Sequence, residues 1–174
     1  MSMIATMRAL DDTRGAVRIE DVYDTDIDDL WHACTDPDRL SRWIARVSGD
    51  LRVGGMIEAE FTSAWVGTLR IEICEAPRHL LLTQLPGTDE EGVIEVWLSE
   101  EGDRARLVVE DRGLPQPDVH YHAAGWQAHF EDLAHTLATG AGPHPDGWPA
   151  GEFAPSWEAR WRELTEEYAA ARLA

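Results

Sequence analysis

The sequence predicts an α+β domain in which one long helix covers the apolar face of an antiparallel sheet. Two observations predict this fold. The first is a strand pattern of alternating apolar residues, namely Trp65, Gly67, Leu69, Ile71 and Ile73, followed after Pro77 by a second apolar run at residues 80–85. Proline cannot continue a strand ladder, so the two runs are expected to be antiparallel neighbours. The second is residues 123–137, the later segment that is long and apolar enough to cover them.

Length and charge limit the classes of function and partner that the chain can have. The chain has 174 residues, 44% of them hydrophobic, which suits one domain with one core. Fifteen basic residues stand against thirty-three acidic ones, for a formal net charge of −18. Such a charge repels nucleic acid and anionic membrane surfaces, so neither is an expected partner. We interpret the charge as a contribution to solubility.

The cysteines and the N-terminal sequence indicate the compartment. Cys34 and Cys74 are far apart and lie in apolar settings, so we expect two buried, reduced side chains. Residues 1–10 lack a basic start followed by a long apolar run, and no stretch reaches the length of a membrane span. We therefore expect a soluble cytoplasmic protein.

The N-terminal part predicts an arm, a strand and two short helices. Residues 1–15 are expected to form a loose arm or a short edge element, and residues 16–23 a first strand. Thr25 and Asp28 resemble a capping box for a helix that buries a stripe ending at Cys34. Asp36 and Pro37 predict the start of a second short helix. Its apolar side comprises Leu40, Trp43 and Ile44.

The middle of the chain predicts further strands. Residues 49–55 are expected to turn, and residues 56–61 alternate again as a strand. A loop at 86–92 leads to a hairpin of strands 93–98 and 105–111. Its apolar face carries Ile94, Val96, Leu98, Leu107 and Val109, and Trp97 points to the other face, where we expect the tail or an interface to cover it.

The C-terminal part predicts two helices. In the longer one, apolar residues recur at helical spacing and Gly140 stands at the C-terminal cap position; they are Trp126, Phe130, Leu133 and Leu137. Residues 141–155 are rich in glycine and proline and suggest a linker. Ser156 is placed to cap a last helix whose apolar stripe comprises Trp157, Trp161, Leu164 and Tyr168.

Several segments in this order resemble a known superfamily. They are DLWHACTDPDRLSRWI (29–44), VGG (53–55), GTLRIEICEAPRHLLLTQ (67–84), EGDRARLVVEDRGL (101–114) and GWQAHFEDLAHTL (125–137). They resemble the START-like or Bet v 1-like (SRPBCC) superfamily, and within it the family named after the activator of the Hsp90 ATPase, over about residues 17–139. The resemblance implies a helix-grip fold: a curved antiparallel sheet wrapped around a long C-terminal helix, with two short helices after the first strand. It also implies a cavity that often receives apolar or amphipathic small molecules.

The resemblance implies a domain at residues 1–140, with its core at 16–140. Residues 141–174 are then a linker and an extra amphipathic helix that packs on the domain or on a partner subunit. Three roles for this helix stay open: it plugs the cavity, covers the sheet or makes a homodimer. The co-chaperone that names the family has an additional N-terminal domain without a counterpart in this sequence, so no Hsp90 interaction is expected. Gln84 stands where the family often has tryptophan, which makes the cavity more polar there.

The candidate ligand-binding residues come from the inward positions of the predicted strands and helices. Aromatic and aliphatic side chains that converge on an interior suit an apolar ligand, although they equally suit a filled core. The candidates are Trp43, Phe61, Trp65, Leu69, Ile71, Leu82, Gln84, Val96, Leu107, Val109, Asp111, His122, Trp126 and Phe130.

Asp111 and His122 are the candidate catalytic residues. Asp111 is the acid whose strand parity matches the buried face, so it is either a cavity acid or a solvated strand end. His120 and His122 lack a third ligand at fixed spacing, so no metal and no cofactor are expected. No hydrolase motif is present. We expect a small-molecule binding protein, with a cyclase- or isomerase-like enzyme and an interaction or stress-response module as alternatives.

Overall fold

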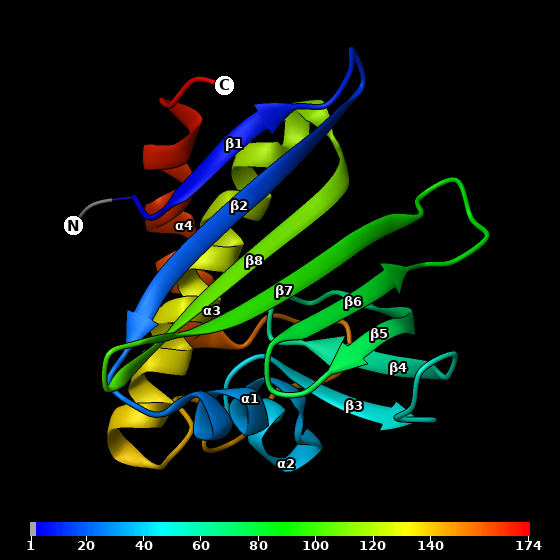
Figure 1. Ribbon diagram of the computed structural model, residues 1–174. Helices are drawn as coiled ribbons and strands as arrows, with labels where there is room; N and C mark the ends of the chain where they lie inside the picture. The colour runs from blue at the N-terminus through cyan, green and yellow to red at the C-terminus, as the bar shows by residue number, and fades with distance from the viewer. Residues whose placement is uncertain (1–2) are drawn as a thin grey trace.

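The structure, a computed structural model, describes residues 3–174. One curved, fully antiparallel sheet has the strand order β1-β2-β8-β7-β6-β5-β4-β3, and the long helix α3 lies across one of its faces (Figure 1). The strands are β1 (Ala5–Ala9), β2 (Arg14–Tyr23), β3 (Ala45–Gly49), β4 (Met56–Phe61), β5 (Val66–Glu75), β6 (His79–Gln84), β7 (Gly92–Glu101) and β8 (Arg104–Pro115). The helices are α1 (Ile27–Thr35), α2 (Pro37–Leu40), the 3-10 turn η1 (Gln116–Asp118), α3 (Val119–Thr139) and α4 (Pro155–Ala169). The predicted helix-grip fold is confirmed.

The alternation that predicted β5 holds only as far as Ile71. The register with β6 shifts between Ile71 and Ile73, so that Ile71 pairs with Leu82 and Ile73 pairs with Leu81. A bulge of this kind moves the following residues to the opposite face. Cys74 therefore lines the inner side in place of Ile73, and it is exposed at the strand end, which corrects the prediction that it is buried.

Two edge strands complete the sheet. β3 pairs with β4, and its residues lie between the second short helix and the turn at 49–55, where the sequence predicted no strand. β1 pairs with β2, so residues 5–9 form the short edge element that was one of two expectations for this segment. The C-terminal residue reaches the same edge, because Ala174 donates to the Met7 carbonyl at 2.8 Å and accepts from the Ala9 amide at 3.3 Å. These bonds occupy part of an otherwise open strand edge.

The two short helices begin at aspartates. Asp26 caps α1 by accepting from the Asp29 amide at 2.8 Å, while Thr25, the expected cap, donates its hydroxyl to the Asp29 carboxylate at 2.6 Å. Asp36 caps α2 by accepting from the Asp38 amide at 3.0 Å, with Pro37 at the first helical position as predicted. The carboxylate of Asp26 is the stronger local acceptor, which explains why α1 begins one residue later than expected.

Helix α3 is buried on several sides. Every residue from Ala123 to Phe130 is buried, because β1 and β2 cover one side of the helix and α4 covers another. Gly140 ends the helix in the left-handed conformation at φ 73°, as its position predicted. No helix of residues 3–174, α3 included, is both long and apolar enough to cross a membrane.

The C-terminal segment packs on its own chain. Trp157, Leu164 and Tyr168 of α4 are buried against α3, so the stripe that predicted this helix is satisfied within the monomer. Ser156 does not cap α4; its hydroxyl hydrogen-bonds to His144 Nδ1 at 3.1 Å. The preceding segment is ordered against the sheet, since Phe153 forms an isolated bridge with Ser63. Trp97 lies on the opposite face, stacked on His79 and away from α4, which corrects the idea that the tail covers it.

Replacing Tyr168 with phenylalanine is expected to lower the free energy of unfolding by about 1–2 kcal/mol. The Tyr168 hydroxyl is buried and links three elements: it donates to the Gln127 side chain of α3 and accepts from the Ala5 amide of β1 at 3.0 Å. Urea unfolding measures the change. Tyr121→Phe is the control, because Tyr121 is 44% exposed and its loss should stay within about 0.5 kcal/mol. Equal effects of the two substitutions would contradict this role of Tyr168.

Candidate functional site

Two adjacent cavities lie between the sheet and the helices. The larger has a volume of about 400 Å³ and opens between the β4–β5 turn, α3 and α4. The smaller, of about 180 Å³, lies under α1 and α2 against the inner faces of β3 to β8. Phe61, Ile94 and Trp126 line both cavities and form the partition between them. The space exists because α3 packs along β1 and β2 and leaves the other half of the sheet for shorter segments to cover (Figure 1).

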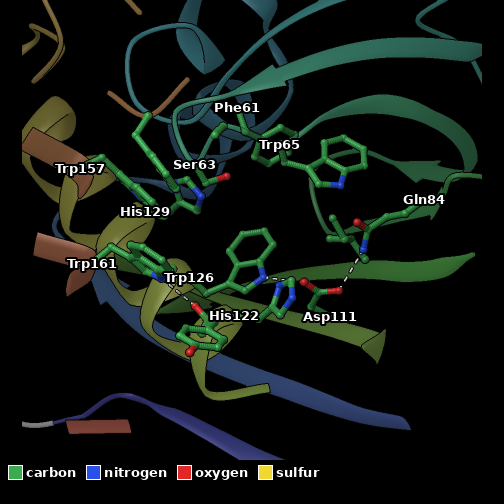
Figure 2. A pocket seen from close by; sticks show the side chains of 15 residues that line it. Phe61, Ser63, Trp65, Gln84, Asp111, His122, Trp126, His129, Trp157 and Trp161 are labelled. Atoms are coloured by element: carbon green, nitrogen blue, oxygen red, sulfur yellow. Dashed lines mark hydrogen bonds between the residues drawn. The ribbon is translucent and has the colours of Figure 1, made fainter. Parts of the chain in front are cut away.

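The larger cavity has aromatic walls from three parts of the chain. Trp65 comes from the turn before β5, Trp126 from α3, and Trp157 and Trp161 from α4 (Figure 2). Gly67 allows the Trp65 ring to fold back over β5, since a Cβ at this position would lie 2.7 Å from that ring. The Phe61 and Trp65 rings meet edge to face at 5.4 Å.

Asp111 is the polar centre of the larger cavity. Its side chain is buried at 4% exposure, and each carboxylate oxygen accepts one hydrogen bond at 2.9 Å, from Gln84 Nε2 and from Trp126 Nε1 (Figure 2). Burial raises the pKa of Asp111, while the positive charge available on His122 and the two hydrogen bonds oppose that rise. The predicted inward parity of Asp111 is therefore observed, and it is no solvated strand end.

His129 is a neutral, buried imidazole in the wall of the same cavity. Thr62 is its hydrogen-bond partner, with 3.4 Å between Oγ1 and Nδ1, and Phe61, Trp126 and Trp157 surround its ring. Burial, and to a smaller extent the charge of the nearby His144, lower the pKa of His129 to about 3. His129 therefore contributes a neutral polar group to the cavity at physiological pH.

Lowering the pH is expected to destabilise the folded protein through His129. Its ordinary pKa is about 6.5 and its folded pKa about 3, so below pH 6.5 the unfolded chain takes up a proton that the folded chain does not. The stability difference between wild type and His129→Gln should therefore shrink by about 1.4 kcal/mol per pH unit from pH 6 to pH 4. Urea unfolding at several pH values measures it. His135→Gln, at an exposed position of α3, is the control, and a difference that stays constant with pH would contradict the assignment.

The smaller cavity is apolar, and its lining contains no charged side chain from the described residues. Its walls are formed by six strands, β3 to β8, together with α1, α2 and the residues after them. Cys34 faces it, and burial raises the pKa of this thiol to about 12, so the thiol stays protonated. An apolar cavity beside an aromatic cavity with a polar centre suits an amphipathic ligand.

The structure places thirteen of the fourteen predicted ligand-binding residues in the cavity walls. The larger cavity receives Trp65, Gln84, Asp111 and His122, and the smaller one receives Trp43, Leu69, Ile71, Leu82, Val96, Leu107 and Val109, while Phe61 and Trp126 line both. Phe130 lines neither: it is buried in the core, with its ring 6.2 Å from that of Tyr23. It lies one helical turn beyond Trp126, where α3 already contacts the body of the sheet.

The sequence left open whether the C-terminal segment meets the cavity, and it did not indicate which of its residues form a wall. Phe153, Trp157 and Trp161 stack on one another with ring centroids 5.4–5.9 Å apart and close one side of the larger cavity. Their spacing of four residues was the available signal, but it does not specify which surface the stripe meets. Gly125 of α3 lies against this stack, where a Cβ would make an ordinary contact with the Trp157 ring at 3.4 Å.

Other polar clusters do not belong to the cavities. His144 connects Asp132, at 2.8 Å from Nε2, with Ser156, at 3.1 Å from Nδ1. These are the residue types of a hydrolytic triad, but none of the three lines either cavity, and they tie the segment after α3 to α3 itself. Within residues 3–174 no group of three or more histidine, cysteine or acidic side chains is placed to hold a metal ion.

Comparison with known proteins identifies the family. Residues 24–138 match the family model described as "Activator of Hsp90 ATPase homolog 1-like protein", which covers well over half of the chain. The chain belongs to this family. The predicted membership of the SRPBCC superfamily is thereby confirmed. A search of curated proteins gives no match.

Solved structures agree with the Activator of Hsp90 ATPase homolog 1-like assignment. The crystal structure of CalU16 from Micromonospora echinospora has 26% identity and a TM-score of 0.69, over 95% of this chain and 94% of that one. The solution structure of BPP1335 from Bordetella parapertussis, at 24% identity and a TM-score of 0.67 over 100% and 94% of the chains, shares the fold. DynU16, described as a putative protein in the dynemicin biosynthetic locus, has 24% identity and a TM-score of 0.68, over 76% of this chain and 49% of that one.

Proposed function

We propose that this member of the Activator of Hsp90 ATPase homolog 1-like family binds an apolar or amphipathic small molecule between the sheet and α3. The observation that carries the proposal is the pair of adjacent cavities, of about 400 and 180 Å³, which share Phe61, Ile94 and Trp126. Ligand pockets are typically concave, mainly apolar and supplied with a few polar groups that orient the ligand. The aromatic walls and the Asp111–Gln84 pair meet both conditions.

The proposal assigns binding to the single chain. Helix α4 covers α3 and supplies a wall of the larger cavity, so in this proposal it has no need of a partner subunit. A homodimer and Hsp90 binding are no part of it, and a cytoplasmic location stays a prediction. The DynU16 description places that protein in the dynemicin biosynthetic locus, which supports the inclusion of biosynthetic small molecules among the first ligands to test here.

Ligand binding can be tested by titrating a panel of fatty acids, flavonoids and polyketides while following tryptophan fluorescence. We expect saturable binding of at least one class. Val96→Phe should weaken that binding about tenfold, because Val96 is buried in the wall of the smaller cavity and a larger side chain would occupy it. Val93→Phe, at a half-buried position of opposite parity on β7, is the matched control. A flat response across the panel would count against the proposal.

Acid–base catalysis is a second candidate function. Asp111 is buried, has a raised pKa and interacts electrostatically with His122, which is the arrangement expected of a cyclase- or isomerase-like acid–base pair. If the chain is such an enzyme, Asp111→Asn should abolish the conversion of a bound polyketone while apolar binding remains. Equal conversion by both proteins would exclude Asp111 from the chemistry.

A further inference from the structure

The charge distribution around Asp111 distinguishes between classes of ligand. Asp111 is the acidic residue in the lining of the larger cavity, and among the described residues that lining contains no lysine or arginine. The other polar members are neutral or are histidines: Ser63, Gln84, His122 and His129. An anionic ligand would meet a buried carboxylate with no fixed cation nearby, so the cavity disfavours anions.

The hydrogen bonds of Asp111 favour its carboxylate form. Both partners, the Trp126 indole and the Gln84 amide nitrogen, donate to the carboxyl oxygens at 2.9 Å. These donors are neutral, so they satisfy the acceptor oxygens without cancelling the negative charge. A cation in the cavity would supply a positive charge to balance the Asp111 carboxylate. His122 on α3 is the neighbouring side chain whose positive charge would compete with such a cation.

The walls around this carboxylate suit an organic cation. Trp65, Trp126, Trp157 and Trp161 line the cavity together with Tyr121. Aromatic faces attract alkylammonium ions through the ring quadrupole, and the attraction grows when the ion leaves water. Phe61, Ile94 and Phe153 belong to the lining of the same cavity and offer apolar surface for a hydrocarbon chain.

We propose that the larger cavity receives the ammonium head of an amphipathic organic cation beside Asp111, with its hydrocarbon chain against the apolar and aromatic side chains of the same cavity wall. This inference rests on the proposed binding function and names the chemical class of its ligand. It predicts the order of affinity cation, then neutral alcohol, then anion, for ligands with the same chain. The formal net charge of −18 attracts cations to the whole molecule, so the test must separate binding at Asp111 from binding at the surface.

The test compares octyltrimethylammonium, octan-1-ol and octanoate by isothermal titration calorimetry at 150 mM salt. Wild type is expected to bind the cation about tenfold more tightly than the alcohol, with octanoate weakest. Asp111→Asn should lower the affinity for the cation about tenfold and change that for the alcohol less than threefold. Asp103→Asn, which removes one exposed charge in the β7–β8 turn, should leave all three affinities unchanged.

The possible outcomes separate the cation inference from the proposed binding function. Equal binding of cation and alcohol by wild type overturns the cation inference and leaves the proposed binding function in place. Cation binding that Asp111→Asn does not weaken assigns the cation to the surface and also overturns the inference. If wild type binds none of the three probes and none of the ligand panel above, both proposals fail. If circular dichroism shows that Asp111→Asn does not fold, the wild-type titrations are repeated at about 500 mM salt, which screens attraction to surface charges more than attraction to a buried carboxylate. A cation preference that persists supports the inference, and one that disappears overturns it.

Discussion

Replacing Trp126 with alanine is expected to lower the free energy of unfolding by about 3–5 kcal/mol and to join the two cavities into one. Trp126 is 8% exposed and lines both cavities. Its indole nitrogen donates to Asp111 at 2.9 Å, and its ring meets that of His129 at 5.7 Å. The alanine variant would remove the partition and leave the Asp111 carboxylate with one donor fewer, which raises the cost of its burial.

Urea unfolding measures this loss, with Trp97→Ala as the matched control. Trp97 is half-buried on the outer face of the sheet, where it stacks on His79 at 5.8 Å, so its removal should cost only about 1–2 kcal/mol. Similar losses of unfolding free energy for the two variants would contradict a packed partition at Trp126.

Trp126→Phe separates the packing role of the side chain from its hydrogen-bonding role, because it keeps most of the ring and removes the indole N–H donor. In that variant the pKa of Asp111 should rise further.

Replacing Trp157 with alanine is expected to be similarly destabilising, by about 3–5 kcal/mol, and to open the larger cavity to solvent. Trp157 is 2% exposed and packs between α3 and α4, with its ring 5.1 Å from that of His129 and 5.7 Å from that of Trp161. Its loss would leave a void in the contact that holds α4 on the domain. Ligand affinity should fall with it, because the ring is part of the cavity wall.

The control for Trp157 lies on the same helix. Arg162 is exposed and pairs with Glu158 across one helical turn, so Arg162→Ala should change the unfolding free energy by less than about 0.5 kcal/mol. Unfolding by urea gives both values, and its slope reports whether α4 has detached, since detachment reduces the surface that unfolding exposes. A small loss for Trp157 with unchanged ligand affinity would show that α4 is not a functional part of the wall.

Strong local patterns predicted much of the fold. The alternation at residues 56–61 corresponds to β4, and the parity of Asp111 relative to Val109 matched the inward face of the strand, where its carboxylate is buried. These predictions succeeded because period and parity are local properties of a strand. Strand β3 was missed because it is a five-residue edge strand, ARVSG, with little alternation. The bulge in β5 was missed because it depends on pairing with β6.

The candidate site was predictable only as a set of inward positions. The sequence indicated Asp111, Gln84 and Trp126 separately, but their hydrogen bonds join β8, β6 and α3, and no local pattern encodes such a contact. The wall formed by Phe153, Trp157 and Trp161 was missed for the same reason. The apolar stripe of these residues had to be buried against another surface, and only the packing of α4 on α3 determines which surface that is.

Indole N–H signals of the eight tryptophans in a ¹⁵N–¹H correlation spectrum test the central claim most directly. The claim is that a small molecule binds between the sheet and α3. On titration with a ligand from the panel, we expect saturable shifts of the Trp65, Trp126 and Trp157 signals, which come from the cavity walls, and none for Trp97 on the outer face. Shifts confined to Trp97, or no shift with any ligand, would contradict it.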